Sequence, residues 1–534
     1  MPNKSMTHCL SFRNCKPNIQ KLFYQSFQKH SYTNSKAAAM HCGCLSLNKG
    51  QNTMNTDHLV NSGLMFAIKH LCEFNRYREY LNENDEDLVR GEDKIIAETA
   101  LLVLLLSRNP TKNHEKAHLL RRIISIVTTF ACSERNKSLI LRLPQLSASL
   151  GIPYIVLSRL GIKDAELDGI IANSLFSDTV NAIERVPFRD MDLRWIRYVY
   201  TEDTTYLEET ENFLDNSILG GKATALHMQR EDFYALTHCI MYLSDFGSKT
   251  ISGLDVNSME ILITECIKVN LLEMDFDLIA ELLLCLSYVS DDLTYASELS
   301  LQFSVSAWSK LGFLPSRSFD PETFKGLKGS EKAAYSFSTI YHTLYVSLLM
   351  IDKLNENYGL KSFSVSDNFE DEIRKRAISV FIDLSSNKTR SKKSKCVNHS
   401  HCPYSLEQMA ARFVLKNKGE ERKIEWLKYM IENDTLDQIH QMKLLLDLSL
   451  ISAIKRYDLD EIVDLIVFAK TLNLGSSSFT VRAAISFLLD QQLNTGFIGA
   501  HFVVEENKNS THSEEFHNKV AYCLDYYFSI TSQA

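Results

Sequence analysis

The strongest constraint on this chain is a layout that occurs three times: an acidic residue begins an apolar helical segment, a short polar break follows, and a second amphipathic segment returns. The three units begin at Asp93, Asp277 and Asp437. Apolar residues at i, i+3, i+4 and i+7 give each helix one face to bury, and a single hairpin cannot cover both of its apolar faces. We therefore predict an all-α fold of repeated helical hairpins, which stack as an α-solenoid or close into an α/α toroid.

Composition agrees with this prediction and indicates more than one domain. The 534 residues include only 19 Gly and 9 Pro, which is little turn chemistry for a many-stranded protein. The chain is also longer than one hydrophobic core can use. We expect a basic disordered tail over residues 1–53, or a translation start assigned too far upstream. We expect two domains after it: an N-terminal helical domain over 54–230 and a toroid-like hairpin domain over 231–534 that contains a loop at 385–404.

The distribution of charge and cysteine restricts the partners and the compartment. No acidic residue occurs from Met1 to Thr56, and such a basic start resembles an organellar transit peptide as well as a tail. The net charge of -8 is spread along the chain, so we expect no nucleic-acid partner. The most apolar stretch, Ala100 to Leu106, is too short for a bilayer, which needs about 20 residues. The 12 Cys at scattered, often apolar positions are typical of reduced thiols, and we expect a cytoplasmic protein without a membrane span.

A polar stripe on the segment from Glu231 to Gly247 is the first candidate site. At about 100° per residue, one arc of a helix there would carry Tyr234, His238, Tyr242 and Asp245. An imidazole, two phenols and a carboxylate in one row can hold a proton near neutral pH, bind a metal or hydrogen-bond a polar ligand. Satisfied polar side chains at a helix contact are the alternative interpretation.

A second segment, Tyr335 to Met350, places Ser338, His342 and Tyr345 on one helical face. If the two helices are neighbours, His238, His342 and Asp245 would form a group of two histidines and one carboxylate, which suits iron or zinc. We therefore name these three residues as candidate catalytic residues and Tyr234, Tyr242 and Tyr345 as candidate ligand-binding residues. The candidate cofactor is a divalent metal.

A short sulfur- and nitrogen-rich cluster is another candidate metal site. Cys396, His399, His401 and Cys402 lie within seven residues, directly after a run of basic side chains. A second pair of ligands at a distance is missing, so an exposed loop or hinge is the alternative.

Two stretches of sequence resemble known families. The pattern T-H-x-x-x-Y-x-x-D-F-G from Thr237 to Gly247, with Y-H-T from Tyr341 to Thr343, is similar to an uncharacterised bacterial all-helical family, a domain of unknown function. The resemblance implies a helical fold, points to His238, Asp245 and His342, and supplies no activity. The phrase LLDQQLNTGFIGA at 488–500 resembles a turn of α/α toroids such as terpene cyclases and protein prenyltransferases.

Two functions remain open on this evidence. The first is a helical-repeat scaffold or binding protein that holds a peptide, protein or small-molecule partner on a concave surface. The second is an enzyme of bacterial specialised metabolism whose cavity, lined by His, Tyr and Asp, performs acid/base or metal-dependent chemistry. No P-loop, dinucleotide fingerprint, nucleophile elbow or kinase motif occurs, which argues against the common nucleotide-binding and hydrolase classes.

Overall fold

The structure is a computed structural model, and every residue that it describes falls within the unit Leu45–Ala534. The described residues are 53–73, 89, 91–108, 113–208, 213–220, 223–273, 275–311, 313–359, 362–364, 439–471 and 478–490. The predicted tail up to residue 52, the loop at 385–404 and the phrase at 491–500 lie outside them. So do Cys396, His399, His401 and Cys402.

The described chain is helical apart from one short pair of strands, which confirms the all-α prediction. Strands β1 (Thr53–Asn55) and β2 (Ser362–Ser364) pair antiparallel, with Met54 opposite Phe363. The first helices are α2 (Thr56–Leu71), α4 (Gly91–Ser107), α5 (His114–Ala131), α6 (Glu134–Arg142), α7 (Ser147–Arg159), α8 (Ala165–Leu175), α9 (Asp178–Ala182), α10 (Pro187–Thr201) and α11 (Phe213–Asn216). The later helices are α12 (Arg230–Leu243), α13 (Val256–Glu273), α14 (Phe276–Val289), α15 (Tyr295–Leu311), α16 (Pro321–Gly326), α17 (Gly329–Tyr358), α21 (Ile439–Arg456), α22 (Leu459–Thr471) and α23 (Phe479–Asp490). Two single turns of 3-10 helix lie at Pro144–Leu146 and Thr204–Leu207.

The helix ends follow the local chemistry of the sequence. Asn113 and Ser133 accept hydrogen bonds from backbone amides in the first turns of α5 and α6, which otherwise lack partners. Asp275 does the same for α14. An acidic residue therefore precedes this helix in addition to Asp277, the acidic residue that was predicted to begin it. Gly359, with φ of 62°, ends α17 in the left-handed conformation that glycine adopts without strain.

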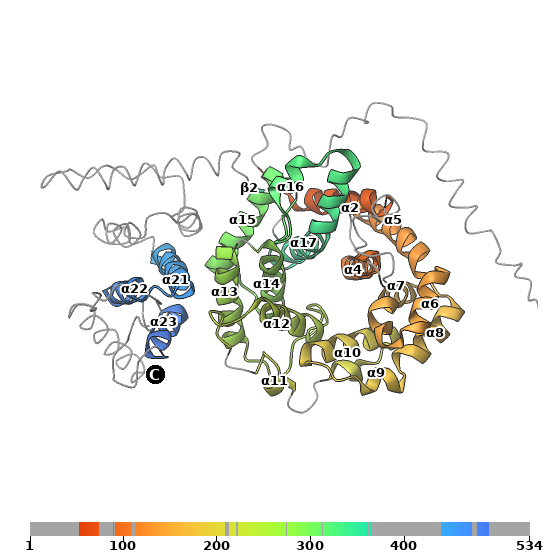
Figure 1. The fold of residues 1–534 in the computed structure, drawn as a ribbon, viewed down its shortest axis with the longest axis horizontal. Helices are drawn as coiled ribbons and strands as arrows, with labels where there is room; N and C mark the ends of the chain where they lie inside the picture. The colour runs from red at the N-terminus through yellow and green to blue at the C-terminus, as the bar shows by residue number, and fades with distance from the viewer. Residues whose placement is uncertain are drawn as a thin grey trace, which may run out of the picture. The chain divides into compact units, whose positions relative to one another are not determined.

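Helices far apart in sequence build the part of the core that surrounds the candidate site. Helix α17 packs against α2, α4 and α14, and α12 packs against both α10 and α14 (Figure 1). Consecutive segments also pack together, α4 with α5 and α21 with α22. Helix α14 is buried at every position from Phe276 to Ser287, as its largely apolar sequence indicates. Contacts therefore cross the boundary predicted at residue 230, since α2 and α4 meet α17 and α10 meets α12.

A buried ionic cluster connects α13 to α21. Lys268 Nζ lies 2.6 Å from both Glu265 Oε1 and Asp447 Oδ2. Thr480 Oγ1 donates to Glu265 Oε2 at 2.6 Å, and Ser478 Oγ donates to Asp447 Oδ1 at 2.8 Å. The ammonium thus lies between two buried carboxylates, and the remaining oxygen of each is also hydrogen-bonded.

No single described helix is both long and apolar enough to cross a membrane. Glu134–Arg142 and Pro144–Arg159 pass such a test only when joined, and they meet at a bend of 111°.

Candidate functional site

A cavity of about 670 Å³ lies among helices α4, α7, α10, α12, α14 and α17. Its apolar wall is largely aliphatic, with Ala97, Leu101 and Leu105 contributed by α4. This volume falls in the range of roughly 300–1,000 Å³ that ligand pockets commonly have. The cavity is therefore large enough for a small organic molecule.

Five of the predicted site residues line this cavity. Tyr234, His238 and Tyr242 reach it from α12, and His342 and Tyr345 reach it from α17. The helical period explains the first three, because a spacing of four residues keeps side chains on one face of α12. The structure thus brings the two histidines to one cavity. The carboxylate expected beside His342 was that of Asp245, and the structure places other carboxylates there.

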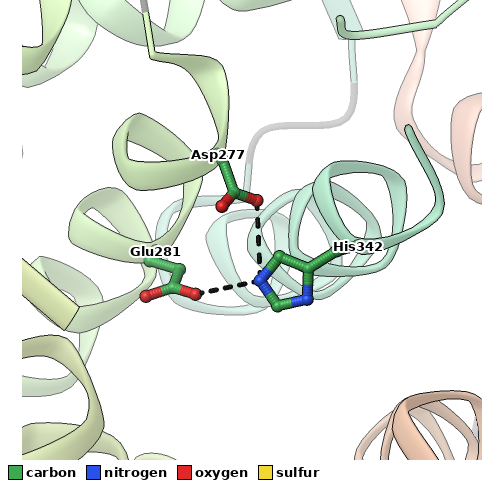
Figure 2. A group of neighbouring side chains, drawn as sticks. All are labelled: Asp277, Glu281 and His342. Atoms are coloured by element: carbon green, nitrogen blue, oxygen red, sulfur yellow. Dashed lines mark hydrogen bonds and ion pairs between the residues drawn. The ribbon is translucent and has the colours of Figure 1, made fainter. Parts of the chain in front are cut away.

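His342 lies between carboxylates on both of its ring nitrogens. Nδ1 is 2.7 Å from Glu98 Oε2, on α4. Nε2 faces α14, at 3.3 Å from Glu281 Oε1 and 3.6 Å from Asp277 Oδ1 (Figure 2). The His342 side chain is 35% exposed, whereas those of Asp277 and Glu281 are 5% and 2% exposed. The imidazole is therefore the accessible member of a largely buried group, which we call the His342 cluster: Glu98, Asp277, Glu281 and His342.

Neighbouring hydroxyl groups fix the carboxylates of the His342 cluster. Tyr234 Oη donates to Asp277 Oδ2 at 2.6 Å. Thr237 Oγ1 donates to Glu281 Oε2 at 2.5 Å. The Glu281 oxygen that faces His342 is the other one, so Thr237 orients the carboxylate without covering that oxygen. Thr343 Oγ1 adds a longer hydrogen bond to Asp277 Oδ1, at 3.2 Å.

The charges in the cluster reinforce one another. Burial opposes the charged imidazolium, but Glu98, Asp277 and the hydrogen bond to Glu281 outweigh it, so the pKa of His342 lies well above its ordinary value. Burial alone would raise the pKa of Glu98 and of Glu281, yet their interactions with His342 lower both. At neutral pH the cluster therefore holds an imidazolium beside the ionised carboxylates of Glu98 and Glu281.

A second polar group lines the cavity from α10 and α12. Burial raises the pKa of Asp192, and hydrogen bonding with Tyr242 and attraction to His238 act in the opposite direction. Burial and the neighbouring Asp192 raise the pKa of Tyr242 well above its ordinary value. The His238 ring lies within 5.9 Å of the rings of Phe188 and Tyr242, and its Nδ1 is buried without a hydrogen-bond partner. This imidazole is thus surrounded by aromatic side chains.

Asp245 serves a different purpose from the one expected, and the carboxylates that meet His342 are Asp277 and Glu281 instead. Asp245 Oδ1 accepts from Arg108 Nη2 at 2.7 Å and from the Trp195 indole at 2.8 Å. The expectation assumed that the helix continues to Gly247, whereas α12 ends at Leu243. Residues 245–247 then turn with φ of 46°, 52° and 76°, which carries the Asp245 carboxylate out of the stripe. The D-F-G sequence is therefore a structural turn, held by Arg108 directly after α4 and by Trp195 of α10.

Glu98 and Glu281 were not among the predicted site residues, and Asp277 was predicted only to open a helix. A usable signal was present, because Asp277 and Glu281 are separated by four residues in an otherwise apolar helix. This spacing places both carboxylates on one face, and buried carboxylates are rare unless they are paired. Glu98 likewise interrupts an apolar run in α4.

Asp277, Glu281 and His342 can together offer three ligand atoms to a metal ion, since these atoms lie within 4.8 Å of one another. The other candidate metal site, which includes Cys396 and Cys402, lies outside the described residues.

Comparison with known proteins identifies a family without an assigned activity. No curated protein matches the chain, and no solved structure matches it. The family model described as "Domain of unknown function (DUF6895)" matches residues 61–351, which is more than half of the chain. The match includes the helical segments that carry the His342 cluster and the whole stripe of α12. The chain therefore belongs to the family of this domain of unknown function, DUF6895.

Proposed function

We propose that the chain is an enzyme that binds a small amphipathic molecule in the cavity and acts on the polar group of that molecule. The observation that carries this proposal is that the His342 cluster opens onto the cavity, since Glu98, Glu281 and His342 all line it. A large, mostly apolar cavity with a few converging polar groups is typical of a ligand site. Strongly shifted pKa values at such a place are typical of catalytic groups.

The cluster supports acid/base chemistry on the bound molecule. His342, held as an imidazolium, can donate a proton from Nε2, and Glu281 can accept one. Glu98 would keep the ring in place from the opposite nitrogen. The apolar body of the ligand would contact the aliphatic residues of α4, such as Leu101.

The scaffold alternative has less support among the described residues. A peptide-binding face commonly presents a contiguous apolar patch. The exposed large apolar side chains lie instead on several separate elements and loops: Met65, Val89, Leu141, Ile183, Val186, Val256, Ile261 and Tyr457. We keep a closed toroid or a solenoid of hairpins as the proposed arrangement. A bacterial cytoplasm, which is reducing, suits the buried free thiols of Cys239, Cys266 and Cys285.

A cavity-filling variant tests the proposal. Ala97 lines the cavity and is 7% exposed, so Ala97→Phe adds a ring inside it. Ala182→Phe adds the same ring at an exposed position of α9 and is the matched control. The probes are naphthylmethylamine, naphthylmethanol and naphthoate, and binding to the EDTA-treated full chain is measured by thermal shift and calorimetry.

We expect at least one probe to bind the wild type and the Ala182→Phe variant, and to bind Ala97→Phe at least about tenfold more weakly, a difference of about 1.4 kcal/mol. Equal binding by folded Ala97→Phe would refute the cavity as the binding site. Circular dichroism of each variant establishes that it is folded.

A further inference from the structure

We infer that Asp277, Glu281 and His342 bind a divalent transition-metal ion of the Zn²⁺, Fe²⁺ or Mn²⁺ class. This inference rests on the proposed function, because the ion would lie at the cavity and polarise the molecule bound there. Imidazole favours zinc and iron, and carboxylates extend the choice to manganese.

The spacing of the ligand atoms fits such an ion. Metal–ligand bonds of about 2.0–2.2 Å in a tetrahedral arrangement hold ligand atoms roughly 3.4 Å apart. His342 Nε2 lies 3.3 Å from Glu281 Oε1 and 3.6 Å from Asp277 Oδ1 (Figure 2). Two of the three edges of the site therefore already have the required length.

The second layer of hydrogen bonds leaves the ligand atoms available. A carboxylate on the far nitrogen of a ligating histidine fixes the ring and its tautomer, and Glu98 occupies that position with respect to Nδ1 of His342. Tyr234 holds the Asp277 oxygen that points away from Nε2. Thr237 holds Glu281 in the same manner. These partners contact each proposed ligand at an atom that does not face the metal. Thr343 Oγ1 also donates to the metal-facing Oδ1 of Asp277, at 3.2 Å, but a carboxylate oxygen keeps a second lone pair for the ion.

The local charge also favours a cation. Three carboxylates surround one imidazole, and the nearest cations lie at the margin of the cluster. Arg230 Nη2 is 3.7 Å from Asp277 Oδ2, and Lys94, whose side chain is 71% exposed, is 3.6 Å from Glu98 Oε1. The contrast is the cluster of α13 and α21, where Lys268 lies 2.6 Å from two carboxylates and already supplies the cation.

Three protein ligands leave coordination positions for water or for the bound molecule, as in catalytic zinc sites. Since His342 and Glu281 line the cavity, a molecule there can reach these positions. The ion would then act as a Lewis acid. His342 would release its Nε2 proton to solvent when the ion binds, and would coordinate the ion instead of donating that proton to the bound molecule.

The test titrates the tag-free, EDTA-treated full chain with Co²⁺ and then displaces the cobalt with Zn²⁺. Glu281→Gln and His342→Ala remove proposed ligands. Glu356→Gln removes one carboxylate charge from an exposed position of α17 and is the matched control. Glu98→Gln tests the positioning role of that residue, and circular dichroism follows the folding of every variant.

We expect about one Co²⁺ per chain, with a visible spectrum of oxygen and nitrogen ligands. Glu281→Gln and His342→Ala lower the affinity at least about tenfold, Glu98→Gln lowers it about 10–100-fold, and Glu356→Gln leaves it unchanged. Folded Glu281→Gln with the affinity of the wild type would overturn the inference, as would an absence of binding by the wild type. A sulfur-to-cobalt charge-transfer band would also overturn it, and this spectrum decides the question even if a variant fails to fold.

The two proposals fail separately. The cobalt titration contains no organic ligand, and the naphthyl probes are measured without metal. If the wild type binds no cobalt but binds the probes in a way that depends on the cavity, the metal site is refuted and the ligand cavity stands. If it binds cobalt but the Ala97→Phe variant binds the probes as the wild type does, the ligand cavity is refuted and the metal site stands.

Discussion

Replacing Lys268 with Met is expected to release α21 from α13. The ammonium of Lys268 lies 2.6 Å from Glu265 and from Asp447, whose side chains are 8% and 2% exposed. Burial opposes the charge of Lys268, but Asp447 and Glu265 outweigh it and raise the pKa of the ammonium. Met keeps most of the side-chain volume and removes the charge, so two buried carboxylates lose their counter-ion. Breaking a buried ion pair in this way costs about 3–5 kcal/mol.

Hydrogen exchange of backbone amides measures this loss of local stability in the helices where it occurs. A cost of about 3 kcal/mol corresponds to an increase in local opening of roughly a hundredfold, at about 1.4 kcal/mol for each factor of ten. We expect the amides of α21 and α23 to exchange faster by this factor in Lys268→Met, while those of α4 and α17 change little. The triple variant that adds Glu265→Gln and Asp447→Asn removes the unpaired charges and restores most of the protection. Unchanged exchange in α21 would show that the cluster does not hold these helices.

Three further predictions concern the turn, a buried histidine and the cavity. Gly247→Ala would place a Cβ atom against the ring of Tyr288 at a φ of +76°, so we expect urea denaturation to show a loss of unfolding free energy of about 1–3 kcal/mol; a neutral effect would contradict the turn as described. Burial lowers the pKa of His70 to about 4, so the folded state binds the proton less readily than the unfolded state. The free energy of unfolding is therefore unaffected by this group above about pH 6.5, and it falls by about 3 kcal/mol as the pH falls towards 4. Urea unfolding at pH 7, 5 and 4 should show this fall in the wild type and a smaller one in His70→Phe, and parallel curves would refute it. The acidic residues that line the metal-free cavity outnumber the cationic ones, since Asp93, Glu98, Asp192, Glu231 and Glu281 stand against Lys94, Arg189 and the His342 imidazolium. Naphthylmethylamine should therefore bind at least about tenfold more tightly than naphthoate, and calorimetry showing equal affinities would contradict this charge balance.

The fold could be predicted from the sequence to the level of helices. The apolar period fixes which face of each helix is buried, and the segments that begin near Asp93 and Asp277 are helices, as expected. Which helices are neighbours could not be predicted in this way. Amphipathic faces are interchangeable, and the packing of α17 against α2, α4 and α14 joins segments that are far apart in sequence.

The candidate site was predictable only where it depends on the helical period within one helix. The period placed Tyr234, His238 and Tyr242 on one face, and they line the cavity together. It misplaced Asp245, because α12 ends at Leu243, two residues before Asp245, and the backbone then enters the left-handed region. Asp277 was interpreted as a helix opener because an acidic residue in the first turn suits the helix dipole. Its contact with His342 depends on the packing of α14 against α17.

The most direct test of the account is anomalous X-ray scattering from crystals of the full chain grown with Zn²⁺. We expect one strong peak enclosed by Asp277 Oδ1, Glu281 Oε1 and His342 Nε2, at about 2.0–2.2 Å from each. The peak should be absent from crystals of the Glu281→Gln variant. A zinc peak at cysteine ligands, or an empty site in the wild type at saturating zinc, would contradict the account.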